Sequence, residues 1–153
     1  MKKIIGLIVV IFCFWGCSTT LQKTSDLSPI TIDKKAGTNE VAFVSVCVTA
    51  KTSDEQLLEI RKKIIQHTKI RFTNFDVIRG SNGDIYFLSM AIDCRDGYSG
   101  EFSHSFEPGD TSVQGFYRHY YKNTYNKPFV FGDISDMPAY EPVKRDTVTP
   151  PQE

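Results

Sequence analysis

The chain has 153 residues, a length that fits one compact domain with its tails, so we expect a single hydrophobic core. Its 18 basic and 18 acidic residues balance, which excludes attraction of nucleic acid through bulk charge. The sequence contains no internal repeat.

Residues 1–18 have the three-part layout of a secretory signal. Lys2 and Lys3 give a positive start, an apolar run extends from Ile4 to Trp15, and small residues follow where a peptidase could cut. A helix that spans a bilayer needs about twenty apolar residues, and this run is shorter. We therefore expect residues 1–16 to be a signal peptide.

The end of this segment, Phe14-Trp15-Gly16-Cys17, resembles the lipobox of bacterial lipoproteins. In that family a cysteine after a small residue becomes the acylated first residue of the mature chain. Gly16 and Cys17 match the motif, whereas Phe14 and Trp15 replace the usual aliphatic and small residues. The resemblance implies lipidation of Cys17 and a lipid anchor in the cell envelope, which we expect in the outer membrane rather than the inner one, on the periplasmic or the surface side. An ordinary signal peptide with an incidental cysteine, or an uncleaved anchor, is the alternative.

The part after the signal divides into three by composition. Residues 17–40 are rich in Thr, Ser, Lys and Asp without a sustained period, so they read as a lipid-anchored flexible tether. A single domain is expected over residues 41–132. Residues 133–153 contain several prolines and no periodic pattern, so we expect a disordered tail.

The first half of the domain predicts a strand, a helix and a second strand. β-Branched residues alternate over residues 41–50, which indicates a strand with one core face. Ser53 and Gln56 have the spacing of a capping box, so a helix should begin there and end near Lys69. Residues 70–78 are strand-like, with a bend around Thr73 and Asn74.

The second half predicts two further strands and an aromatic helix. Asn82-Gly83 is typical of a hairpin turn, after which residues 85–94 form a central strand and residues 98–106 a half-buried one. Residues 111–125 begin with a second capping-box spacing and carry aromatic residues at helical intervals. The same residues have high strand propensity, and Gly115 weakens the helix interpretation. Residues 129–131 fit a short edge strand.

The order strand, helix, strand, strand, strand, helix predicts an α+β domain. We expect a mainly antiparallel sheet of about four strands, with the two helices packed on one face.

Cys47 and Cys94 are the cysteines left in the domain. Exported proteins fold in oxidising compartments, so a disulfide between them is one interpretation. Two buried free thiols are the other, because cysteine is among the most often buried residues. Cys94 lies on the apolar face of its strand, whereas Cys47 lies opposite the core face of its own, so only a bulge would bring the two Cα atoms within about 7 Å.

No catalytic or metal-binding pattern stands out. His67, His104 and His119 lack the spacing of a zinc motif. Ser103-His104-Ser105 invites comparison with hydrolases, but the sequence has no Gly-x-Ser-x-Gly motif, so a half-buried strand residue is the better interpretation of His104. We therefore expect no catalytic site, no metal, no cofactor and no enzymatic activity.

A cluster of aromatic residues with a cation is the one feature that points to recognition. Tyrosine covers apolar area and keeps a wet hydroxyl, which favours it at interfaces. Packing of the expected helix on the sheet would explain part of the cluster, but it does not require every tyrosine. The predicted binding surface consists of Tyr117, Arg118, Tyr120, Tyr121 and Tyr125.

Taken together, the sequence indicates a membrane-anchored bacterial lipoprotein whose small periplasmic or surface-exposed domain binds another envelope macromolecule, as an accessory of a secretion or envelope assembly. An exported enzyme and a purely structural envelope component are the alternatives. A concave polar pocket near His104 or Glu101 would favour an enzyme, and an exposed aromatic patch would favour a binding protein. The partner is expected to be a protein.

Overall fold

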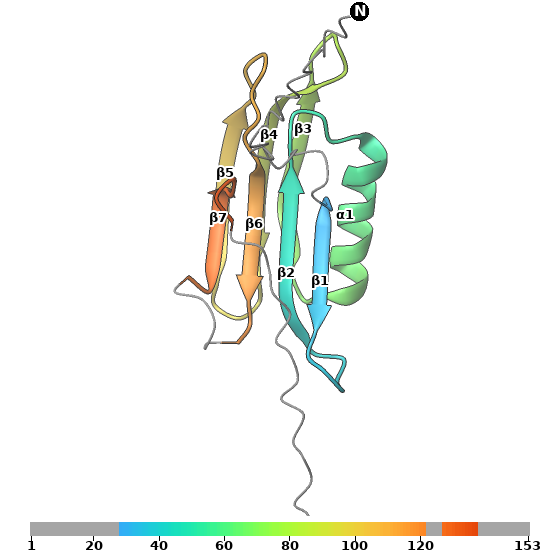
Figure 1. The fold of residues 1–153 in the computed structure, drawn as a ribbon, viewed down its shortest axis with the longest axis vertical. Helices are drawn as coiled ribbons and strands as arrows, with labels where there is room; N and C mark the ends of the chain where they lie inside the picture. The colour runs from blue at the N-terminus through green and yellow to red at the C-terminus, as the bar shows by residue number, and fades with distance from the viewer. Residues whose placement is uncertain (1–27, 122–126, 138–153) are drawn as a thin grey trace, which may run out of the picture.

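The computed structural model describes residues 28–121 and 127–137. This part of the chain forms, in order, β1 (Ile30–Lys34), β2 (Val41–Val48), α1 (Asp54–His67), β3 (Arg71–Arg79), β4 (Ile85–Asp93), β5 (Ser99–Ser105), β6 (Gln114–His119) and β7 (Phe129–Asp133) (Figure 1). Sheet A has the strand order β1-β2-β6-β7, and sheet B has the order β3-β4-β5. All neighbouring strands are antiparallel.

The prediction of one sheet with two helices on one face is therefore wrong. The two sheets lie face to face, and the main core fills the space between them. Figure 1 shows sheet A in front of sheet B, with α1 along the side next to β1. Helix α1 also packs against this core, so the core is formed by both sheets and the helix. The buried residues of the main core include Val44, Val46, Val48, Leu57, Ile60, Ile64, Leu88, Met90, Ile92 and Phe116.

Helix α1 forms as its sequence predicts. The Ser53 hydroxyl accepts a hydrogen bond from the Gln56 backbone N–H at 3.3 Å, and the Gln56 side chain accepts one from the Ser53 N–H at 2.9 Å. This capping box satisfies two of the N–H groups that the first turn leaves without helical partners. Leu57, Ile60 and Ile64 are spaced to share one face, and all three are buried.

The predicted aromatic helix is in fact strand β6. Every residue of β6 is buried, because Phe116 enters the main core while Tyr117 enters a second apolar cluster on the outer face of sheet A. A strand that is buried on both faces has no polar alternation, and its aromatic residues then fall at intervals that also fit a helix. The capping-box spacing from Thr111 to Gln114 does not begin a helix: Gln114 is the first residue of β6, and its side chain donates to the Ser112 hydroxyl at 3.1 Å.

The domain begins and ends outside the predicted limits of 41 and 132. Ile30 and Ile32 alternate in β1, which pairs with β2, and their apolar side chains contribute to the main core. Residues 30–34 therefore belong to the domain and not to a tether. At the other end, Ile134 is buried, and its N–H donates to the Val113 carbonyl at 2.8 Å. The predicted edge strand is confirmed as β7, at one edge of sheet A.

Candidate functional site

The predicted recognition surface does not form one exposed face. Tyr117 and Arg118 are neighbours in β6, so their side chains leave the strand on opposite faces, and both are buried. Tyr120 is half-buried, and Tyr121 is 38% exposed. Tyr125 lies outside the described residues, as does Cys17, the predicted lipidation site.

Arg118 instead ties the two sheets together. Its Nε and Nη2 atoms donate to Asp96 Oδ2 at 2.9 and 2.7 Å, and Nη1 donates to the Pro128 carbonyl at 2.9 Å. The guanidinium carbon lies 4.0 Å from the centre of the Tyr98 ring and 4.9 Å from that of Tyr120. Asp96 and Tyr98 belong to the turn between β4 and β5 of sheet B, so these contacts link the two sheets. The guanidinium group is engaged in them and is not presented to a ligand.

Cys47 and Cys94 are buried free thiols in the structure, as in the second of the two interpretations that the sequence allows. Cys94 is part of the main core, whereas Cys47 belongs to the second cluster on the outer face of sheet A. The strand parity that opposed a bridge holds, because no bulge brings Cys47 to the inner face. Burial raises the pKa of Cys47 to about 11 and that of Cys94 to about 12, so both thiols stay protonated at neutral pH.

His104 takes part in a small polar network that does not match a hydrolytic triad. Its Nε2 atom lies 3.0 Å from Asp110 Oδ2 and 3.4 Å from the Ser112 hydroxyl. A triad places the carboxylate and the hydroxyl on opposite ring nitrogens, and here both approach the same one. The backbone N–H of Ser112, and then His104, hold the pKa of Asp110 below its usual value. The network thus orders the loop between β5 and β6.

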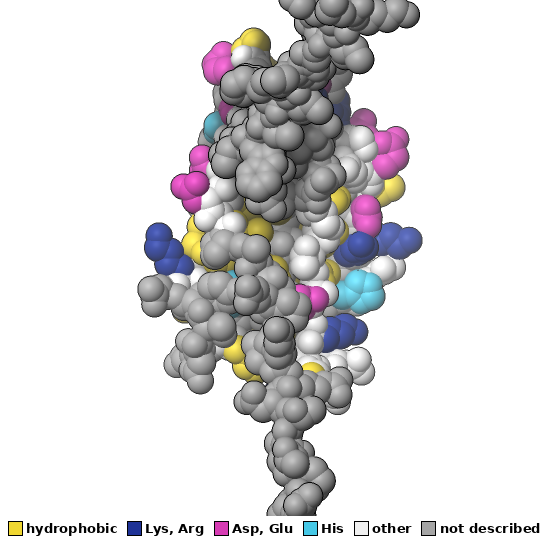
Figure 2. All heavy atoms as spheres, in the orientation of Figure 1, with side chains coloured by type: hydrophobic (Ala, Val, Ile, Leu, Met, Phe, Trp, Pro, Cys, Tyr) yellow, Lys and Arg dark blue, Asp and Glu magenta, His cyan; other side chains and the backbone are white. Residues whose placement is uncertain are grey.

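A basic groove lies between α1 and β3. It has a volume of about 1000 Å³ and is lined by three parts of the chain: α1, the start of β3, and the turn after β4. We call it the basic groove and define it by Arg61, Lys69, Arg71 and Arg95, with Ile65 and Phe72 as its apolar members. Figure 2 shows basic side chains gathered along the side occupied by α1, toward its C-terminal end, with acidic ones toward its N-terminal end.

The cations of the basic groove have little opposing charge. Within residues 28–121 and 127–137, no ion pair with a carboxylate is formed by Arg61, Lys69 or Arg71. Arg95 makes one loose pair, with 3.6 Å between its Nε and Asp93 Oδ2. Asp76 is the one carboxylate among the residues that line the groove. The groove therefore has a positive potential that an anionic ligand would neutralise.

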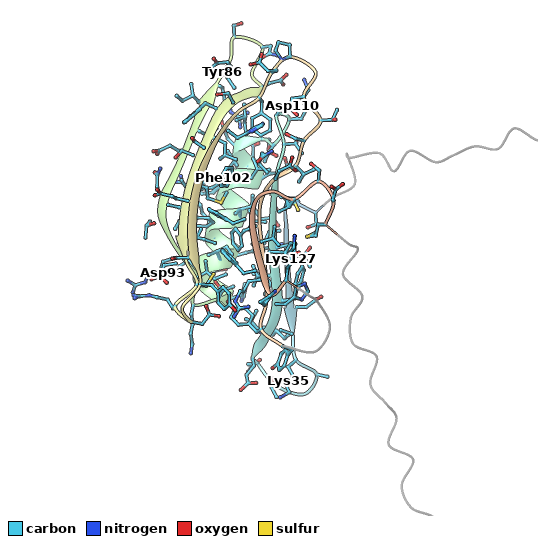
Figure 3. All side chains as sticks on the ribbon, turned by 90° about the vertical axis from the view of Figure 1, so that its left-hand side faces the viewer. Lys35, Tyr86, Asp93, Phe102, Asp110 and Lys127 are labelled. Carbon is cyan, nitrogen blue, oxygen red and sulfur yellow. The ribbon has the colours of Figure 1, made fainter. Side chains whose placement is uncertain are left out.

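A second hollow, of about 490 Å³, lies at the other end of the sandwich, where Figure 3 labels Tyr86 and Asp110. Three of the four charged residues of the described chain that line it are matched or take part in a pair, because Lys51 Nζ lies 2.6 Å from Asp84 Oδ2 and Asp110 pairs with His104. Among the described residues Glu107 is its one charged side chain without an ion pair, so the hollow holds no cluster of unpaired charges like that of the basic groove.

No protein-family model, curated protein or solved structure matches the chain. Among the described residues, no three or more His, Cys, Asp or Glu side chains are grouped so that they could hold a metal ion. The same part of the chain contains no helix with the length and hydropathy needed to cross a bilayer. Geometry and charge are therefore the features that indicate a site in this domain.

The sequence contains only a weak signal for the basic groove. Arg61 lies on the polar face of the predicted helix, which reads as an ordinary solvated surface. Lys69 and Arg71 follow closely along the chain, but the contribution of Arg95 depends on how sheet B brings the β4–β5 turn beside the start of β3. In the register of the two strands Arg71 lies opposite Asp93, and this position brings it near Arg95.

Proposed function

We propose that the protein is a lipid-anchored domain of the bacterial cell envelope that binds an acidic partner macromolecule through the basic groove. The observation that carries the proposal is the set of three cations, Arg61, Lys69 and Arg71, that surround a groove without carboxylate partners. Elsewhere on the described domain Lys35, Lys51, Lys63 and Arg79 each pair with a carboxylate. Lys34, Lys62 and Lys127 are exposed and unpaired in the same part of the chain, but they do not line a groove together.

The two parts of the proposal support each other physically. A lipid on Cys17 would hold the domain at a membrane, since each buried methylene adds about 0.8 kcal/mol of affinity. Confinement at a surface raises the effective concentration of the domain toward any partner that is held at the same membrane. A groove that neutralises a few charges would then suffice for association as an accessory of an envelope or secretion assembly.

Fractionation tests the anchor. Cys17→Ser should move the protein into the soluble fraction or leave the precursor uncut, because the acylated residue is lost. Membrane retention with normal processing of this variant would contradict lipidation.

Affinity capture tests the groove. The full chain is captured from solubilised membranes as wild type, as the double variant Lys69→Glu with Arg71→Glu, and as the matched control Lys62→Glu on the exposed side of α1 outside the groove. The double variant should lose its partner, and the control should retain it. Capture of the same partner by all three proteins would refute binding at the groove.

A further inference from the structure

We infer that the basic groove receives an extended acidic segment of a partner protein, which adds to the free edge of β3 as a fourth strand of sheet B; this inference rests on the function proposed above. Strand addition is a common mode of recognition, in which main-chain hydrogen bonds supply affinity and alternate side chains supply specificity.

The groove follows an unpaired strand edge. Within the described residues, β3 pairs with β4 alone and has no strand on its other side. Six consecutive residues of β3, residues 71–76, line the groove. At roughly 3.3 Å per residue this edge is about 20 Å long, which is enough for a segment of six or seven residues.

The outward backbone groups of β3 face the side of α1, and that of Phe75 lies in the groove. The Phe75 carbonyl accepts a hydrogen bond from Arg61 Nη2, and this contact shows that the carbonyl faces α1 and not β4. In an antiparallel ladder the groups that point outward recur at every second residue, so Val77 presents its N–H and carbonyl to the same side. An added strand would find donors and acceptors at both positions.

Arg61 occupies the place that a partner strand would take. Its guanidinium satisfies the Phe75 carbonyl and lies 4.8 Å from the centre of the Phe75 ring. A backbone N–H from an added strand would replace the guanidinium as the donor to this carbonyl. Arg61 would then be released to pair with an acidic side chain of the added segment, so the exchange keeps every polar group bonded.

The side chains around the edge define the chemistry of the segment. Arg61, Lys69 and Arg71 favour carboxylates, and only Asp76 opposes them among the lining residues. Ile65 is 75% exposed beside the half-buried Phe72, so apolar side chains of the segment would also find contacts. Because a strand presents its side chains alternately, the structure favours a segment in which acidic and apolar residues alternate.

An anionic lipid headgroup shares part of this chemistry, but it would use the cations alone. It has no N–H or carbonyl pattern that matches the edge of β3, and it would leave the Phe75 and Val77 backbone groups as they are. Cations along an edge can also serve only to prevent aggregation. These two readings predict different outcomes in the following experiment.

The test uses the full chain in a nonionic detergent and a labelled seven-residue peptide of alternating glutamate and valine, with glutamate at both ends. A matched peptide carries proline in place of the central valine, which keeps its charge but removes a main-chain donor and disfavours a paired strand. Mixed micelles that contain phosphatidylglycerol or phosphatidylcholine form the lipid arm. Binding is followed by fluorescence anisotropy, and amide hydrogen exchange reports on β3.

We expect the glutamate–valine peptide to bind at least about tenfold more tightly than its proline counterpart, a factor that corresponds to about 1.4 kcal/mol. It should also slow exchange at the Phe75 and Val77 amides. Lys69→Glu with Arg71→Glu should weaken binding by a similar factor, while Lys62→Glu should leave it nearly unchanged. Thermal unfolding of each variant verifies that it is folded.

Three results would overturn the inference. Equal binding of the two peptides would show attraction by charge alone, and an absence of both peptide and lipid binding would leave edge protection as the role of the cations. Binding of phosphatidylglycerol micelles in a groove-dependent manner, without peptide binding, would assign the groove to lipid. The proposed function is tested separately by the affinity capture described above. It is refuted if the variants of the groove cations still capture the natural partner.

Discussion

Replacement of Arg118 by methionine should destabilise the domain far more than the loss of an ordinary surface cation. The substitution keeps an apolar stem of similar length but removes the donors to Asp96 Oδ2 and to the Pro128 carbonyl. Breaking a buried ion pair costs about 3–5 kcal/mol. The Asp96 side chain is 27% exposed, so water can cover part of the carboxylate that is left behind, and the lower part of the range, about 3–4 kcal/mol, applies.

Urea unfolding, with equal slopes required for wild type and variant, measures this loss directly. Such a loss is a large share of a total stability of about 5–15 kcal/mol, and at roughly 4–8 °C per kcal/mol it would lower the thermal midpoint by roughly 12–30 °C. Lys63→Gln is the control, because its pair with Glu59 is exposed and should contribute about 0.5 kcal/mol or less. A cost below about 1 kcal/mol for Arg118→Met would refute the role of this residue as the tie between the sheets.

Three further predictions follow from the packing and the titrating groups. Gly115→Ala should prevent folding or lower the free energy of unfolding by more than about 4 kcal/mol, because its Cβ would lie 1.9 Å from the Val46 carbonyl oxygen. Gly37→Ala is the control: it has open space around it and should lower that free energy by roughly 1 kcal/mol. Denaturant titration compares the two variants. Cys47 and Cys94 should both react with iodoacetamide in urea without reductant and resist it in the folded protein at pH 8, as intact mass would show; a cross-linked pair in urea would contradict this. Burial, and then Arg118, lower the pKa of His119 in the folded protein. The unfolded chain therefore binds the proton more readily than the folded one. The stability that the neutral side chain contributes above about pH 6.5 is lost as the pH falls through the lower folded pKa. Unfolding between pH 7 and 5 should show this slope, and His119→Gln should flatten it; an unchanged slope would argue against the assignment.

The elements that local chemistry decides were predictable from the sequence. The capping box at Ser53 and Gln56 formed with both of its hydrogen bonds, and Asn82-Gly83 lies in the turn between β3 and β4, where Gly83 has a φ of +84°. In each case the residues that determine the conformation are neighbours along the chain. The bend expected near Thr73 is likewise a register shift between Phe72 and Asn74.

The elements that depend on distant contacts were not predictable. The residues of β6 predict a helix because they show no alternation of apolar and polar side chains. This alternation is missing because both faces of the strand are buried, which the sequence alone does not reveal. β1 is a short strand in a polar segment, and it is ordered by pairing with β2 and by Ile30 in the main core. Tertiary packing overrides local preference in both. The basic groove could not be predicted either, because it exists only where α1, β3 and the β4–β5 turn meet.

The strand order of sheet A also determines when the domain can be completed during synthesis. β3, β4 and β5 follow one another and pair as consecutive hairpins, so they can assemble as soon as residue 105 is available. β2, by contrast, pairs with β6 from the opposite end of the domain, with Phe43 beside His119. β1 and β2 can pair with each other at once, but the other edge of β2 stays open until β6 has been made. Until Phe129–Asp133 has emerged, the inner faces of β2 and sheet B have no complete second layer, and apolar side chains that the finished domain buries stay open to other molecules.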